Sequence, residues 1–234
     1  MSQQQYLDAM GITRWQRRDL PMPERTESHQ ALDETLHSVA KPEATPVDAA
    51  QLNWTQMDAA VMQCQHCLHA EGKQKRLGCG HSNADVMFVI AADDQTLLSS
   101  QGYFSEGAQR LFDNMLRAIG LSSQQIYLTA IVKCSPQGDP PLDEEAAVQC
   151  AGYLVRQAAL LKPKVMVVLG SSVVQALQNT KQISDPVGDE PLSYGEEKIP
   201  LLVIHSPEHL LKNPLDKRLA WKELNRLSKR LKTA

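Results

Sequence analysis

Four cysteines have a spacing that suits metal binding. Cys64 and Cys67 form a C-x-x-C pair, Cys134 follows an apolar segment, and Cys150 lies in the amphipathic segment after it. In a parallel sheet the end of a strand and the following helix can lie close together, so the four thiolates could converge on zinc or an iron–sulfur cluster. The alternative is that they are small buried apolar residues. The fifth cysteine, Cys79, is given no role.

A histidine and a basic segment are further candidates. His205, in "HSPEHLL", directly follows the last apolar run, where open α/β sheets place their ligand groups. It is equally compatible with an ordinary strand-capping histidine. Residues 212–232 are the most basic part of the chain and either contact phosphates or form the solvated face of an amphipathic helix.

Alternating apolar runs and amphipathic segments indicate the fold that positions these residues. Runs resembling buried strands occupy 84–92, 126–134, 164–170 and 199–206, and helical spacing fills the intervals between them. The pattern predicts a three-layer α/β/α domain around a central, mostly parallel four-stranded sheet.

The chain divides into three parts by composition. We expect a short apolar peptide over 1–20, a disordered linker over the polar, proline-containing residues 21–50, and the α/β domain over 51–234. A net charge of −3 argues against coating nucleic acid by bulk charge, so DNA contact is expected to be indirect or weak. No long apolar run or signal pattern is present, which favours a cytoplasmic protein without a membrane span.

The domain resembles the family 4 uracil-DNA glycosylases. The similar stretches are "MDAAVMQCQHCLHAEGKQKRLGCG", "GYFSEGAQRLFDNMLRAIGL", "IYLTAIVKCSPQGDPP" and "CAGYLVRQAALLKPKVMVVLG". The resemblance implies a uracil-DNA glycosylase-like fold, and it implies that Cys64, Cys67, Cys134 and Cys150 hold a structural [4Fe–4S] cluster, with zinc as the alternative.

The same resemblance implies a degenerate base pocket. Phe104 matches the aromatic residue that stacks on the flipped base, and His205 matches the family's H-P-S histidine, but Ala91 and Ala92 replace a glycine and an acidic residue. Ala130 replaces the asparagine that reads uracil, and a methyl group has neither its donor nor its acceptor. We therefore expect no catalytic residues and no enzyme activity.

An active glycosylase is the alternative interpretation. Asp93 and Asp94 follow the two alanines and are acidic, although they are displaced from the family position, so they are candidates for activating water. Release of uracil from DNA by the purified protein would decide for this alternative.

The two ends of the chain resemble the psi subunit of the DNA polymerase III clamp loader. "YLDAMGITRWQRRDLP" is similar to the N-terminal peptide of psi, and "SPEHLLKNPLDKRLAWKEL" to its C-terminal pattern. The resemblance implies a non-catalytic replication accessory protein that joins clamp-loader subunits to a chi-like subunit, and so to single-stranded-DNA-binding protein. The expected anchors on the clamp loader are Tyr6, Met10, Ile12, Arg14, Trp15 and Arg17.

Overall fold

A computed structural model describes residues 46–67, 75–91, 103–134, 142–180, 182–184 and 192–233. The peptide over 1–20, expected to dock on a clamp loader, and most of the linker expected over 21–50 lie outside these residues. Residues Ala44–Ala234 form one compact unit. None of the helices in the described ranges is both long enough and apolar enough to cross a bilayer.

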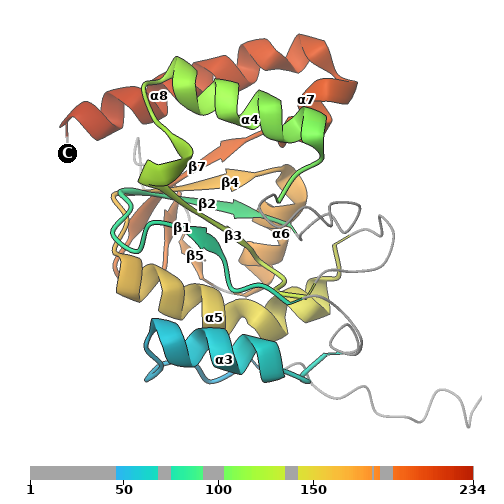
Figure 1. Cartoon of the computed structure of the whole chain (residues 1–234), viewed down its shortest axis with the longest axis vertical. Helices are drawn as coiled ribbons and strands as arrows, with labels where there is room; N and C mark the ends of the chain where they lie inside the picture. The colour runs from blue at the N-terminus through green and yellow to red at the C-terminus, as the bar shows by residue number, and fades with distance from the viewer. Residues whose placement is uncertain are drawn as a thin grey trace, which may run out of the picture. The chain divides into compact units, whose positions relative to one another are not determined.

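Four parallel strands form the centre of the sheet (Figure 1). In spatial order they are β3 (Ile126–Ala130), β2 (Val86–Ile90), β4 (Val165–Leu169) and β7 (Ile199–Ile204). β2, β3 and β4 are buried at every position, because helices cover both faces of the sheet. The predicted parallel four-stranded core is confirmed.

Short antiparallel strands extend the sheet at both edges. β1 (Cys79–Gly80) pairs with β3, and β6 (Ser193–Tyr194) joins β7 to β5 (Ile183–Ser184). Each contains two residues, which is too short for an apolar alternation to be recognised in the sequence.

Helices pack on the two faces according to the alternation of the strand side chains. Val86, Phe88 and Ile90 face a core formed with α4 (Glu106–Ala118) and α8 (Lys217–Thr233). Met87 and Val89 face the opposite core. The helices on that side are α5 (Glu144–Leu161) and α6 (Ser171–Asn179), with α3 (Trp54–Gln63) outside α5 (Figure 1).

One edge of the sheet collects the carboxyl ends of all four parallel strands. Ala91 follows β2, Ala130 ends β3, Gly170 follows β4 and His205 follows β7. A hydrogen bond of 2.8 Å from the Gly170 amide to the Ile204 carbonyl joins the last two strand ends. Loops at this edge are the expected place for a ligand in an open α/β sheet.

Candidate active site and thiol cluster

The residues expected in the base pocket are distributed around this edge. Ala130 is buried, Ala91 is half-buried, and the Ala91 carbonyl accepts a hydrogen bond of 3.3 Å from the Val132 amide. His205 is half-buried after β7, and Ala92 lies outside the described residues. The two described alanines therefore contribute no polar side chain to the site.

Phe104 is part of the core. Its side chain is 3% exposed, and its ring centroid lies 5.0 Å from that of Phe112 on α4. Phe112 in turn packs edge-to-face on Phe88 of β2 at 5.2 Å. These ring contacts hold Phe104 in the core that α4 forms with the sheet.

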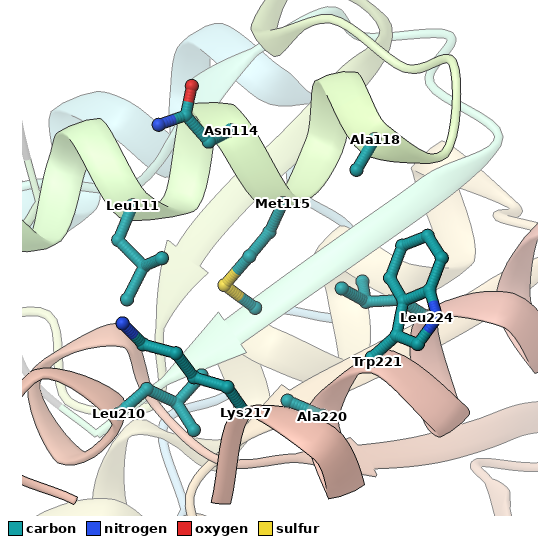
Figure 2. Close-up of a pocket in the computed structure, with 9 residues that line it drawn as sticks. All are labelled: Leu111, Asn114, Met115, Ala118, Leu210, Lys217, Ala220, Trp221 and Leu224. Carbon is teal, nitrogen blue, oxygen red and sulfur yellow. The ribbon is translucent and has the colours of Figure 1, made fainter. Parts of the chain in front are cut away.

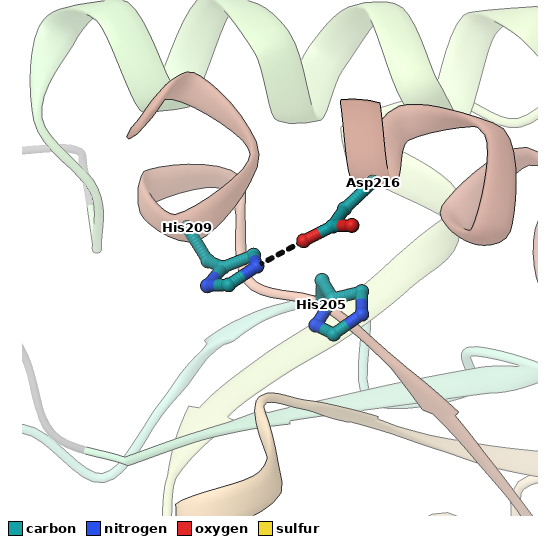
Figure 3. A group of neighbouring side chains, drawn as sticks. All are labelled: His205, His209 and Asp216. Atoms are coloured by element: carbon teal, nitrogen blue, oxygen red, sulfur yellow. Dashed lines mark hydrogen bonds and ion pairs between the residues drawn. The ribbon is translucent and has the colours of Figure 1, made fainter. Parts of the chain in front are cut away.

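His205 belongs to a group of three side chains that the sequence reasoning did not identify. Its ring stacks on that of His209 with centroids 4.5 Å apart and planes inclined by 16°. His209 lies in α7 (Pro207–Lys212), and its Nε2 makes a hydrogen bond of 2.7 Å with Oδ2 of Asp216 (Figure 3). The signal for His209 is its position four residues after His205, once a helix is placed after β7.

The four predicted cysteines come from three different parts of the fold. Cys64 caps the C-terminus of α3, Cys67 follows it, Cys134 lies four residues after β3, and Cys150 is in α5. The Cys134 thiol interacts electrostatically with each of the other three. The structure thus places the four cysteines near one another, and their binding of a metal stays a prediction.

Burial and the neighbouring thiols keep the thiols of Cys134 and Cys150 protonated when no metal is bound. Burial, followed by the neighbouring thiols, raises the pKa of Cys134 from 9.0 to about 12. Burial also raises the pKa of Cys150 to about 11, although a hydrogen bond from the Lys133 backbone and the charge of Lys133 oppose the shift. A bound metal would reverse this, because it coordinates the thiolate.

Zinc and an iron–sulfur cluster, the two metal groups left open by the sequence, require different spacings of the four sulfurs. Tetrahedral zinc, with Zn–S bonds of about 2.3 Å, needs sulfurs about 3.8 Å apart. An iron–sulfur cubane separates its thiolates further, because iron and sulfide lie between them.

A buried lysine lies beside the thiols. Lys133 is 3% exposed, and its Nζ donates hydrogen bonds to Thr129 Oγ1 (2.7 Å), the Ala130 carbonyl (2.7 Å) and Gln157 Oε1 (2.6 Å). Gln157 Nε2 donates onward to Tyr127 Oη at 2.9 Å. Burial lowers the pKa of Lys133 from 10.5 to about 7. The network joins the end of β3 to α5, between Cys134 and Cys150.

An apolar groove lies between α4 and the C-terminal helices (Figure 2). Trp221 of α8 is 47% exposed beside it, while Leu224 is buried at its base. The groove is lined by Leu111, Asn114, Met115, Ala118, Leu210, Lys217, Ala220, Trp221 and Leu224. Its polar lining is limited to Asn114 and Lys217, so it contains no set of groups suited to acid–base chemistry.

Comparison with known proteins identifies several relatives named type-4 uracil-DNA glycosylase. A protein of Archaeoglobus fulgidus named type-4 uracil-DNA glycosylase is 32% identical over 120 residues, which cover 51% of this chain and 60% of that protein. Type-4 uracil-DNA glycosylases of Sulfurisphaera tokodaii and Thermotoga maritima are each 27% identical, over 168 and 159 residues, and the matches cover 74% and 80% of those proteins. The chain thus spans less than two thirds of the first relative and about three quarters of the second.

These relatives overturn the functional prediction. The expectation of a non-catalytic psi-type clamp-loader subunit is wrong, and so is the expectation that the protein is not an enzyme, because the similar proteins are glycosylases. The psi interpretation depended on short motifs at the two ends, which cover far fewer residues than these matches. The anchors expected on a clamp loader and the contact expected with a chi-like subunit remain untested predictions; the anchors, Tyr6 to Arg17, lie outside the described residues.

A family model gives the same assignment over most of the described domain. The model for the uracil DNA glycosylase superfamily matches residues 77–225, which include all four parallel strands and the group around His205. This match covers more than half of the chain. The protein therefore belongs to the uracil DNA glycosylase superfamily.

Proposed function

We propose that the protein is a DNA glycosylase that hydrolyses the N-glycosidic bond of uracil in DNA. The observation that carries the proposal is the similarity to type-4 uracil-DNA glycosylases across the matched domain. The position of His205 at the carboxyl edge of the sheet supports it, since this edge is where such a fold binds ligands. The target nucleotide would be flipped out of the helix to reach this edge.

We assign to His205 the stabilisation of the leaving group, which is the departing base. In the reaction the bond between the base and C1′ breaks, the oxygen of a water molecule bonds to C1′, and negative charge develops on the base. A ring N–H of His205 would donate a hydrogen bond to a carbonyl oxygen of the departing base. Asp93 and Asp94 follow β2 in the sequence and are our candidates for positioning the water; they lie outside the described residues.

Uracil release from a defined oligonucleotide tests this function. The purified protein should release free uracil, detected by mass spectrometry, from a strand containing one uracil. His205→Ala should reduce the rate by about 10²–10³-fold, the usual cost of losing one donor to a developing anion. His81→Ala is the matched control, because exposed His81 precedes the amino end of β2, at the opposite edge of the sheet. Equal rates for wild type and His205→Ala would contradict the assignment.

We also propose that Cys64, Cys67, Cys134 and Cys150 hold a [4Fe–4S] cluster. The donor set is four thiols that lie near one another, and the similarity to type-4 uracil-DNA glycosylases favours a cluster over a single zinc ion. The cluster would act as a cross-link that holds α3 and the segment after it to β3 and α5. Lys75 supports the same junction: its Nζ donates to the Cys64 carbonyl, and its backbone pairs with that of Cys134.

Iron analysis of two cysteine variants tests the cluster. Protein purified without oxygen should contain about four iron and four sulfide ions per chain. Cys134→Ala should lose this content, and Cys79→Ala should keep it, because Cys79 is exposed on the edge strand β1. Stoichiometric zinc without iron in the wild type would show that the site is a zinc site instead.

A further inference from the structure

The group formed by His205, His209 and Asp216 has the composition of a metal site that is separate from the thiols. Its three ligand atoms all lie within 4.8 Å of one another. Two imidazoles and one carboxylate are a donor set used by zinc and by other divalent transition metals. We propose that these three side chains bind one divalent transition-metal ion of the zinc class. The proposal does not depend on glycosylase activity.

The backbone around the group is held in place by local hydrogen bonds. Ser206 caps α7 by accepting a hydrogen bond of 3.2 Å from the His209 amide. The Asn213 amide donates to the His209 carbonyl at 2.8 Å, and the Asp216 amide donates to the Asn213 carbonyl at 3.1 Å. Below them Leu210 is 1% exposed, so α7 is anchored in the core. The ligands therefore come from three consecutive, fixed segments, which is the preorganisation that a metal site needs.

The side chains themselves remain open to solvent. The side chains of His209 and Asp216 are 40% and 35% exposed. Tetrahedral zinc with Zn–N bonds of about 2.0–2.1 Å holds neighbouring ligand atoms about 3.3 Å apart. Rotation of the exposed side chains about their own bonds can bring the ligand atoms from within 4.8 Å to this spacing. Their solvent-exposed side leaves room for water as a further ligand.

The contact between His209 and Asp216 is a hydrogen bond that metal binding would replace. Nε2 of His209 lies 2.7 Å from Oδ2 of Asp216, with the His205 ring stacked beside it (Figure 3). Both side chains would turn toward the ion, His209 would lose the hydrogen-bonded proton, and the carboxylate would offset part of the metal's charge. Proton release on binding is expected for any such exchange.

Cobalt titration separates this site from the thiols. Co²⁺ is added to the full-length, as-purified protein, and absorption spectra are recorded from the near ultraviolet to the red. Cobalt bound by nitrogen and oxygen gives visible d–d bands without the intense near-ultraviolet band of thiolate ligation. The expected result is one equivalent of Co²⁺ bound with the spectrum of a site without sulfur.

Two variants and one control test whether His209 and Asp216 are ligands. His209→Ala and the isosteric Asp216→Asn should each weaken this Co²⁺ binding by more than about tenfold, since even partners outside the first coordination shell are worth about 10–100-fold. His81→Ala should bind as the wild type does. The proposal is overturned if every bound cobalt shows the thiolate band, or if His209→Ala and Asp216→Asn bind cobalt as tightly as the wild type.

Discussion

In the proposed glycosylase, base selection would depend on individual residues at the ends of β2 and β3. The resemblance to family 4 glycosylases matches Ala130 with the asparagine that reads uracil; Ala130 is buried, and its carbonyl accepts a hydrogen bond from Lys133. Sites that reject a wrong substrate by about 10⁴-fold or more do so with buried hydrogen-bonding groups. We therefore expect the protein to prefer uracil over cytosine by less than about 10⁴-fold.

An asparagine amide at position 130 should increase the preference for uracil over cytosine. Ala130→Asn should raise the ratio of uracil release to cytosine release, measured with two otherwise identical oligonucleotides. Ala130→Leu, which adds similar volume without an amide, controls for the effect of bulk. If both variants change the ratio equally, the side chain at this position does not read the base.

Lys133 should make stability depend on pH in the metal-free protein. Its pKa falls from 10.5 to about 7 on folding because of burial, so between these values the unfolded chain binds one more proton than the folded one. The cost of burying the charge is fully present below about pH 7 and is relieved as the pH rises. Above pH 9 the raised pKa values of Cys134 and Cys150 act in the opposite direction, since these thiols ionise first in the unfolded chain.

Urea unfolding at several pH values measures this dependence. The free energy of unfolding of metal-free wild type should rise between pH 7 and pH 9, and Lys133→Met should lose most of that rise. The slope is the informative quantity, because the variant also leaves the three acceptors of Lys133 without their donor. An unchanged slope in Lys133→Met would show that other groups titrate in this range.

At the scale of elements, the packing of the segment around Val47 on α5 requires a glycine at position 152. The Val47 amide donates to the Gln149 carbonyl at 2.9 Å, and a Cβ on Gly152 would collide with the Val47 carbonyl. Gly152→Ala should lower the free energy of unfolding by about 1–3 kcal/mol, the usual cost of overpacking. Gly107→Ala in α4 is the control, because its Cβ would meet only Leu211 Cδ1 at 3.5 Å. Urea unfolding of both variants checks this, and equal stabilities would contradict the close approach.

The longer elements could be predicted from sequence because each carries its own apolar signal. The continuous apolar run "VMFVI" is β2, and the segment "EEAAVQCAGYLVRQAALL", in one of the intervals with helical spacing, is α5. The two-residue edge strands and α7 could not be predicted, since they are too short for a period and depend on their neighbours. His209 and Asp216 were missed for the same reason, because only the turn after β7 brings them to His205.

At the scale of the whole molecule, the parallel sheet brings the thiol cluster and the base site together from distant parts of the chain. Cys134 and Ala130 are four residues apart, and Lys133 between them bonds to both β3 and α5. Motif spacing singled out four cysteines that lie near one another in the structure. The side chains at three expected pocket positions are alanines, which carry no chemical signal of a function, whereas the similarity of the entire domain does.

The most direct test of the proposed glycosylase function is whether the protein removes a single uracil from DNA. Under single-turnover conditions, with protein in excess over a strand containing one uracil, the mass of the strand is followed with time. We expect the wild type to produce an abasic strand and free uracil, and we expect His205→Ala to produce them much more slowly. An intact strand after prolonged incubation with iron-loaded wild-type protein would contradict the proposed glycosylase function.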